Sequence, residues 1–415
     1  MMGSRPRPYY EDEYYDERQY APRPQKKSPK PKGKPSANWD VRTVGNADRT
    51  LIMIVVMLVL IGVVMVFSAS HMNTATRAVF GHDPFWFLRR NAIFAVVGFG
   101  VMALTSKIDY WMYKGIVWVI YGVAIVLLLA VMVFGMAAGG ATRWLIIPGI
   151  DFQFQPSELA RAAVIFTMAY MADKFPKALD NWGGFFIFAS LVGAMVVLIA
   201  IPGGFTTALI TAAIGFGMIF IASPYLWRFV GIGLLGVGSV AGYLGLQALY
   251  GEGQGAFRGG RVNAWLDPFS DHLGLGFQTI QSLYAIASGG LFGLGIGNSR
   301  QASFVPEPHN DIIFAIVVEE IGLVGAGIIL VLFGLFIWRG ILAALNAPDT
   351  FGAMVALGIV FAIAVPTIIN VAVVTNTIPN TGVNLPFISY GGTSLLVSMA
   401  LAGILLNISK YSQTK

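Results

Sequence analysis

Long apolar segments alternate with short polar ones along most of the chain, and this pattern predicts membrane-spanning helices. A helix needs roughly 20 apolar residues to cross the hydrocarbon core of a bilayer, and segments of this kind recur from Leu51 onward. Proline and glycine at 202–204 and at Pro224 separate neighbouring segments, because both residue types stop helices. The ten predicted spans are Leu51–Phe67, Asn91–Thr105, Ile116–Phe134, Ser157–Met171, Gly184–Ile201, Phe205–Ala222, Leu226–Leu249, Asp311–Ile337, Phe351–Val373 and Pro386–Ile408.

Residues 1–48 have a different pattern, with an acidic aromatic stretch, YYEDEYYDERQY, followed by the basic, proline-rich PRPQKKSPKPKGKP. Such a segment has too little apolar content to fold and too much proline for a helix. We expect a disordered cytoplasmic tail on a transmembrane domain of residues 49–415. It is either a solvated tail that sets orientation or an arm that binds lipid headgroups or a partner. It is too long for a signal peptide's basic region.

Composition gives the same class of protein. Hydrophobic residues make up 56% of the chain and charged residues 12%, whereas about a quarter of the residues in soluble domains are charged. Because backbone polar groups in lipid must be satisfied within helices, we expect an all-α polytopic membrane protein. The chain has no cysteine, which excludes disulfides, thiolate nucleophiles and cysteine-ligated metals.

The basic residues lie in the tail and at the ends of apolar segments, which is a topology signal rather than a sign of nucleic-acid binding. With the tail in the cytoplasm, ten spans place both termini on the cytoplasmic side of the membrane. The lysines follow this arrangement, but several arginines fall on the outer side. Guanidinium groups bind phosphate oxygens bidentately, so these arginines suit a pyrophosphate-bearing substrate; pairing with Asp83, Asp151 or lipid headgroups remains an equal alternative. The outer arginines are Arg77, Arg89, Arg90, Arg143, Arg258, Arg261 and Arg300.

Two outer loops stand out. After the first, residues 135–157, Glu158 and Arg161 are three apart and share a helix face. They form either a structural ion pair or a polar anchor beside a cavity. The second, residues 250–310, is far longer than ordinary helix connections. Within it, Gln278 and Gln281 lie on a segment too short to span, which predicts an amphipathic or re-entrant helix with its glutamines toward a polar pocket.

Polar side chains are concentrated between Arg261 and Gly325. Ionisable residues at membrane depth are costly unless they are paired or face a cavity, so this cluster indicates a functional site. Glu319 and Glu320 lie well inside a predicted span, and we expect at least one to pair with a cation or a hydroxyl group. The polar residues of the cluster are Asp267, Asp271, Gln278, Gln281, Glu307, His309, Asp311, Glu319 and Glu320.

Four segments carry a family resemblance that covers the chain from Asp48 onward. They are QPSELAR, LDPFSDHLGLGFQTIQS, GNSRQASFVPEPHNDIIFAIVVEEIGLVG and LPFISYGGTSLLVSMALAGILLNI. These resemble the signature segments of the SEDS family (shape, elongation, division and sporulation proteins), closest to its FtsW branch. The resemblance implies ten transmembrane helices and a peptidoglycan glycosyltransferase that polymerises lipid II for septal wall synthesis. It also implies a class B penicillin-binding transpeptidase and other divisome proteins as partners, in contact with membrane lipids.

The resemblance also implies roles for individual residues. Asp271 matches the family's catalytic aspartate, and we expect it to act as a general base, its proton affinity raised by a partly dehydrated outer cleft. The alternative from spacing alone is a helix N-cap, whereas Asp267 before proline fits a turn. No cofactor is expected to be built in; a divalent cation, Mg or Mn, would arrive with the substrate's pyrophosphate, and any protein metal site is unknown. The expected substrate-binding residues are Arg143, Glu158, Arg161, Arg261, Gln278, Gln281, Ser282, His309 and Asp311.

The chain departs from the family pattern at three positions. Arg161 replaces a lysine and keeps the charge, Gly203 stands where an aspartate is usual, and Thr381 stands where a lysine is usual. The last two put in doubt any contact assigned to those positions. Two other functions stay open: a flippase for lipid II, and a non-catalytic scaffold for the transpeptidase. The short, weakly polar cytoplasmic loops favour the polymerase over the flippase.

Overall fold

The structure, a computed structural model, describes residues 45–76, 81–138, 141–147, 152–225, 227–229, 231, 263–274, 276–305 and 307–411. Residues 1–44 of the expected tail, 1–48, and most of the predicted span Leu226–Leu249 lie outside these residues. The long helices are α1 (Arg49–Thr76), α2 (Trp86–Thr105), α3 (Tyr110–Phe134), α4 (Pro156–Lys174), α5 (Trp182–Ala200), α6 (Phe205–Ala222), α9 (Phe277–Gly289), α10 (Ile313–Leu345), α11 (Thr350–Val374) and α12 (Gly392–Tyr411).

Eight of the described helices are long and apolar enough to cross a membrane: α1, α2, α3, α5, α6, α10, α11 and α12. The expected helical, multi-pass membrane class is therefore confirmed, while the count of ten remains a prediction. The span expected at Ser157–Met171 is helix α4, which carries Glu158, Arg161, Asp173 and Lys174 and is not among the eight.

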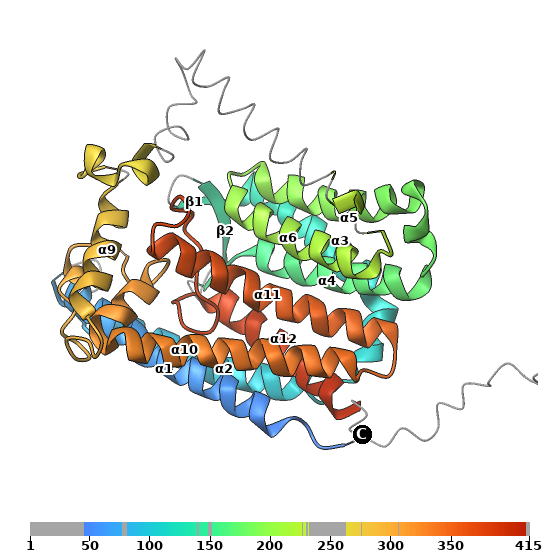
Figure 1. Ribbon diagram of the computed structural model, residues 1–415, viewed down its shortest axis with the longest axis horizontal. Helices are drawn as coiled ribbons and strands as arrows, with labels where there is room; N and C mark the ends of the chain where they lie inside the picture. The colour runs from blue at the N-terminus through green and yellow to red at the C-terminus, as the bar shows by residue number, and fades with distance from the viewer. Residues whose placement is uncertain are drawn as a thin grey trace, which may run out of the picture. The chain divides into compact units, whose positions relative to one another are not determined.

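Helix α4 lies inside the bundle, where it packs against α3, α6 and α11. Ala160, Ala163 and Ala169 on α4 are fully buried, and small residues of this kind let helices approach closely. Helix α1 runs beside α10, and α12 packs on α2 (Figure 1). The burial of α4 allows it to carry charged residues at membrane depth.

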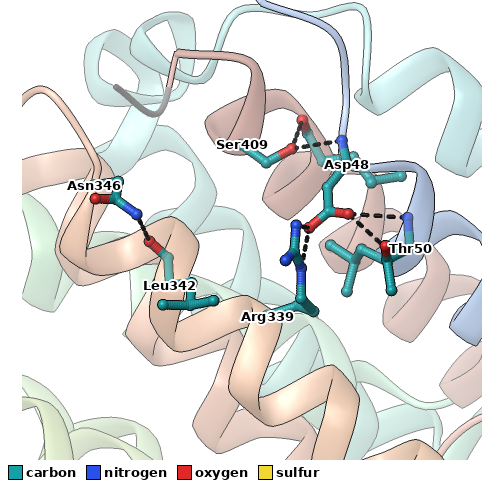
Figure 2. A network of polar contacts seen from close by, with 8 residues as sticks. Asp48, Thr50, Arg339, Leu342, Asn346 and Ser409 are labelled. Carbon is teal, nitrogen blue, oxygen red and sulfur yellow. Dashed lines mark hydrogen bonds and ion pairs between the residues drawn. The ribbon is translucent and has the colours of Figure 1, made fainter. Parts of the chain in front are cut away.

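At one end of the bundle, polar contacts around Asp48 connect the helices (Figure 2). The Asp48 carboxylate accepts hydrogen bonds from the backbone N–H of Thr50, at 2.9 Å, and of Leu51, at 3.2 Å, and so caps α1. It also pairs with Arg339 of α10, and the Asp48 N–H donates to the Ser409 hydroxyl of α12. Three helices are thereby joined at the end where α1 begins and α12 ends.

The opposite end carries a small antiparallel sheet, which the sequence analysis did not predict. Its strands β1 (Met136–Ala138), β2 (Ala141–Ile147) and β3 (Phe152–Phe154) lie in the order β1-β2-β3, with Ala138 opposite Ala141 and Ile147 opposite Phe152. Strand β3 is tied to α12, because the Thr393 hydroxyl donates to the Gln153 carbonyl oxygen at 2.9 Å. The sheet thus lies against the helix bundle and carries Arg143.

Candidate functional site

A polar cavity lies at the sheet-bearing end of the bundle, and its space, counted together with the adjoining open solvent, is about 720 Å³. Strand β2, helices α4, α6, α11 and α12, and the segment before α12 all contribute to its wall. Two arginines and one glutamate supply its charge. The lining residues are Arg143, Trp144, Gln155, Glu158, Arg161, Thr207, Ile210, Ala362, Pro366, Gly382, Val383, Asn384, Pro386, Ser394 and Ser398.

The predicted pair of Glu158 and Arg161 is confirmed, and both side chains line the cavity. Pro156 starts α4 at a position where a missing N–H costs nothing, and Glu158 in the first turn faces the positive end of the helix dipole. Side-chain exposures are 8% for Glu158 and 12% for Arg161. The pair is therefore largely desolvated, and the two proposed roles, ion pair and cavity anchor, coincide.

Arg143 reaches the cavity from strand β2. Its guanidinium donates a hydrogen bond to the Gly203 carbonyl oxygen at 3.0 Å. That acceptor belongs to the backbone, so the contact needs no side chain at position 203. The loss of the family's usual aspartate there does not remove this anchor.

A second polar cluster joins three segments that are distant in sequence. The Gln278 amide donates to Asp311 at 2.9 Å, and the Asn380 amide donates to the Gln278 side-chain oxygen at 2.9 Å. Asn370 donates to the backbone oxygen of Asp311 at 2.6 Å. A Cβ at Gly382, which lines the cavity, would lie 3.6 Å from the Asp311 carboxylate. The cluster therefore adjoins the cavity wall.

Burial changes the acidity of Asp311. Removal of the carboxyl group from water raises its pKa from 3.8 to about 6, an effect that the hydrogen bond from Gln278 partly offsets and the nearby Glu307 adds to. Desolvation disfavours the charged form of an acid. Asp311 is thus a carboxyl group that titrates close to neutral pH beside the cavity.

Asp271 ends the short helix η4 (Pro268–Asp271) and is exposed. The predicted desolvation at this residue is therefore not found, because the turn lies at the surface. Asp271 is also not among the described residues that line the cavity. Helix α9 begins at Phe277 with Gly276 as its N-cap, so Asp271 does not cap it.

Local contacts nevertheless hold Asp271 in a defined turn. Its backbone oxygen accepts hydrogen bonds from the N–H groups of Gly274, at 3.3 Å, and Gly276, at 3.2 Å. A Cβ at Gly274 would lie 2.4 Å from the Asp271 carboxylate, so the carboxylate lies directly against this glycine. Asp267 caps η4 by accepting from the Phe269 N–H, which confirms its predicted role as a turn former.

The other predicted residues lie apart from the cavity or outside the described chain. Ser282 is buried, and its hydroxyl donates to the Gln278 backbone oxygen at 3.0 Å. Gln281 is half-buried on the same helix. His309 is buried, with its ring centroid 3.9 Å from that of Phe87. Arg261 lies outside the described residues.

Several polar residues of the site were not predicted from the sequence: Asn370, Asn380, Ser394 and Ser398. Each lies in or near a predicted span, and an amide or hydroxyl there resembles ordinary helix composition. The expected pairing of a glutamate with a hydroxyl group is confirmed, since Ser68 donates to Glu320 at 2.7 Å. In the described part of the chain, no three His, Asp or Glu side chains gather closely enough to hold a metal ion.

The fold and cavity define a multi-pass membrane protein with an arginine-containing polar site at one end of its bundle. The family model FTSW_RODA_SPOVE, described as "Cell cycle protein", matches residues 48–414. The chain belongs to this family, which confirms the resemblance given by the signature segments.

Curated relatives and solved structures agree. Stage V sporulation protein E of Bacillus subtilis (strain 168) is 38% identical over 370 residues, which cover 88% of this chain and 98% of the relative. A probable peptidoglycan glycosyltransferase FtsW of Geobacter sp. (strain M18) is 37% identical, and the match covers 89% of this chain and 98% of the relative. A chain of the structure "Structural coordination of polymerization and crosslinking by a peptidoglycan synthase complex" matches with a TM-score of 0.71 at 25% identity, covering 88% of this chain and 97% of that one. RodA of Thermus thermophilus shares the fold, with a TM-score of 0.64 at 24% identity; the match covers 89% of this chain and 98% of the RodA chain.

Proposed function

We propose that this protein is a peptidoglycan glycosyltransferase that polymerises lipid II into glycan strands for septal wall synthesis. Family membership and the FtsW relatives support the enzyme class. The observation that carries the proposal is the polar cavity, in which Arg143 and Arg161 lie beside Glu158 within an otherwise apolar bundle. Two guanidinium groups at this depth suit the pyrophosphate of a lipid-linked sugar.

The proposal requires the Asp271 turn and the cavity arginines to act on one sugar, because the base, the anomeric carbon and the leaving diphosphate belong to a single displacement. Asp271 takes the proton of the acceptor sugar hydroxyl, whose oxygen attacks the anomeric carbon as the bond to pyrophosphate breaks. Arg143 and Arg161 stabilise the negative charge that grows on the leaving diphosphate. An exposed base fits a reaction whose acceptor is a bulky sugar on a second lipid-linked chain.

The diphosphate itself would recruit a divalent cation, Mg or Mn. The site faces outward in the bacterial plasma membrane, with both termini in the cytoplasm, because the basic residues Lys114, Arg339 and Lys410 lie at the opposite end. A class B penicillin-binding transpeptidase is the proposed partner, which the match to a chain of a peptidoglycan synthase complex supports. Other divisome proteins and membrane lipids complete the assembly.

The test is polymerisation of purified lipid II by the full chain with its transpeptidase in the presence of Mg or Mn. Asp271→Asn should reduce polymer by at least a hundredfold, the usual loss for a general base, with insertion and folding unchanged. Asp267→Asn is the matched control, because it removes the same charge from the same exposed turn and should retain most activity. Undiminished polymer from Asp271→Asn would remove this residue from the mechanism.

The arrangement favours a polymerase over the alternative flippase. A flippase needs a polar path through both halves of the bundle, whereas the residues that line the described cavity lie toward the sheet-bearing end, and at the other end polar contacts around Asp48 join three helices. Lipid II movement across proteoliposomes without polymer would support the flippase. Transpeptidase recruitment with neither activity would support the scaffold.

A further inference from the structure

The segment after α9 runs back along α10 and fills a break in that helix. At Gly322 the backbone of α10 leaves the helical conformation, with φ 70° and ψ 179°. Residues 290–295 occupy the gap and pair with 319–324, so this part of the outer loop is built into α10. The four backbone hydrogen bonds run from Leu294 N–H to Glu319 O (2.9 Å), Gly295 N–H to Glu320 O (2.9 Å), Leu323 N–H to Gly290 O (3.0 Å) and Val324 N–H to Leu291 O (3.1 Å).

Two buried carboxylates hold the same segment from the side. Glu319 and Glu320 are 0% and 1% exposed. The Glu319 carboxylate accepts from the backbone N–H of Arg300 at 3.0 Å and from the Ser299 hydroxyl. Ser68 of α1 links the other acid to the segment: its hydroxyl donates to Glu320 at 2.7 Å and accepts from the Gly297 N–H at 2.8 Å.

These contacts answer a physical problem of irregular backbone in lipid. Non-helical chain at membrane depth leaves N–H groups that water cannot satisfy, each at a cost of several kcal/mol. Among the described residues, neither Glu319 nor Glu320 pairs with a basic side chain; their partners are N–H and hydroxyl groups. The two acids therefore serve as acceptors for the segment that returns from α9.

The exposed side chains of residues 291–296 are apolar, and the exposed polar residues of the segment, Asn298 and Arg300, follow where it returns toward the outer surface. Leu291, Phe292 and Ile296 are 61%, 80% and 60% exposed, and they adjoin Leu323 and Val324 on the exposed face of α10. Gly322 lies nine residues into α10, about 14 Å from its start. A helix of 33 residues is about 50 Å long against a hydrocarbon core of about 30 Å. If the surplus is shared equally between both ends, Gly322 lies about 4 Å inside the hydrocarbon edge and Glu320 lies at that edge.

We propose that α9 and residues 290–301 form a re-entrant hairpin seated in the lipid, and that Glu319 directly, and Glu320 through Ser68, are its positioning residues. Helix α9 carries Gln278, whose amide holds Asp311 beside the cavity, and it follows directly on the Asp271 turn. A displaced hairpin would therefore displace both polar clusters. The kinetic part of this inference rests on the proposed function; the structural part does not.

The first experiment measures depth. Because the chain has no cysteine, a single introduced cysteine takes a nitroxide label at one position. In liposomes, the label on Phe292→Cys should collide with oxygen and be shielded from a water-soluble nickel chelate, like the reference Val331→Cys on the exposed face of α10. The exposed His272→Cys should behave oppositely. A label at 292 as accessible to nickel as the one at 272 would overturn the hairpin.

The second experiment tests the acids as positioning residues. Labels on Ala287→Cys and Val331→Cys should give a narrow distance distribution in the parent. Ser68→Ala should broaden it and lower polymerisation by on the order of tenfold to a hundredfold. Ser190→Ala, the same change at an exposed serine of α5, should do neither. Glu320→Gln should restore a narrow distribution relative to Glu320→Ala, because an amide oxygen still accepts from Ser68.

The outcomes separate this inference from the proposed function. Unchanged distances and rates in Ser68→Ala and Glu320→Ala would overturn the positioning role. If Ser68→Ala does not fold, Glu319→Gln provides the same comparison. It keeps the size of the side chain and weakens the hydrogen bonds that this side chain accepts from Ser299 and the Arg300 N–H. A parent without polymerase activity would remove the proposed function, while the depth and distance measurements would still decide the hairpin.

Discussion

At the scale of single residues, Asp311 gives the protein a pH dependence of defined sign. Its pKa is raised from 3.8 to about 6 by burial, so the folded protein holds this proton more tightly than the unfolded chain. The resulting stability is fully present below about pH 4 and is lost as the pH rises through 6, a change of about 3 kcal/mol at most. In detergent, Asp311→Asn should therefore reduce the slope of the melting temperature against pH between pH 4.5 and 7.5. Asp267→Asn should keep the parent's slope, and an unchanged slope in Asp311→Asn would contradict the assignment.

The Glu158–Arg161 pair is the second prediction at this scale. Glu158→Gln leaves Arg161 with a neutral partner in a largely desolvated wall, and charged hydrogen bonds are worth about 1.5–3 kcal/mol. We expect polymerisation to fall about tenfold or more. Arg161→Lys should retain most activity because it keeps the charge. The double variant Glu158→Gln, Arg161→Met should lose less polymerisation activity than the losses of the two single variants, added as free energies, predict. Strict additivity of these free energies would show that the two side chains act independently.

Local pairs could be predicted from the sequence, whereas contacts between distant segments could not. The spacing of Glu158 and Arg161 and the Asp–Pro step at Asp267 are local signals, and both predictions are confirmed. The link between Gln278 and Asn380 spans 102 residues, so no spacing rule indicates it. The exposure of Asp271 depends on how the outer loop folds back, which is also a tertiary property.

At the scale of elements, apolar length predicted most spans, but two irregular elements were missed. The sheet at 136–154 contains TRWLII between GG and PG, a strand pattern with turn residues on both sides that the membrane context obscured. The break in α10 carries only a glycine at 322, which is common in membrane helices. The break can be recognised only from the folded structure, in which residues 290–295 pair with α10.

The break in α10 makes its own prediction. A Cβ at Gly322 would lie 2.3 Å from the Leu291 carbonyl oxygen, and φ there is 70°. Gly322→Ala should cost about 1–3 kcal/mol, lower the melting temperature and increase the mobility of a label on Phe292→Cys. Gly327→Ala is the matched control, since nothing lies within 4 Å of its added Cβ; it should be neutral or slightly stabilising. Equal effects of the two changes would show that the break is not held by close contact.

At the scale of the whole transmembrane unit, the two ends of the bundle have different tasks. The sheet-bearing end opens into a polar cavity, with loops above it that supply polar groups from distant segments. The other end is fastened by short polar contacts between helix ends, around Asp48 and around Asn407, which accepts from the Tyr110 N–H at 3.0 Å. This difference between the two ends fits a site that is used from one face of the membrane.

The Asp48 contacts test that division of tasks. Asp48→Ala removes both the cap of α1 and the ion pair with Arg339, whereas Arg339→Met removes only the pair. A cap is worth about 1 kcal/mol, and a pair whose arginine is 37% exposed contributes less than about 1 kcal/mol. Asp48→Ala should therefore lower the melting temperature more than Arg339→Met, and Asp48→Asn, which keeps a capping oxygen, should resemble Arg339→Met. If the contacts around Asp48 serve only to hold the helices together, polymerisation below the melting temperature should stay unchanged in all three variants. Lost activity without lost stability would instead show that this end communicates with the cavity.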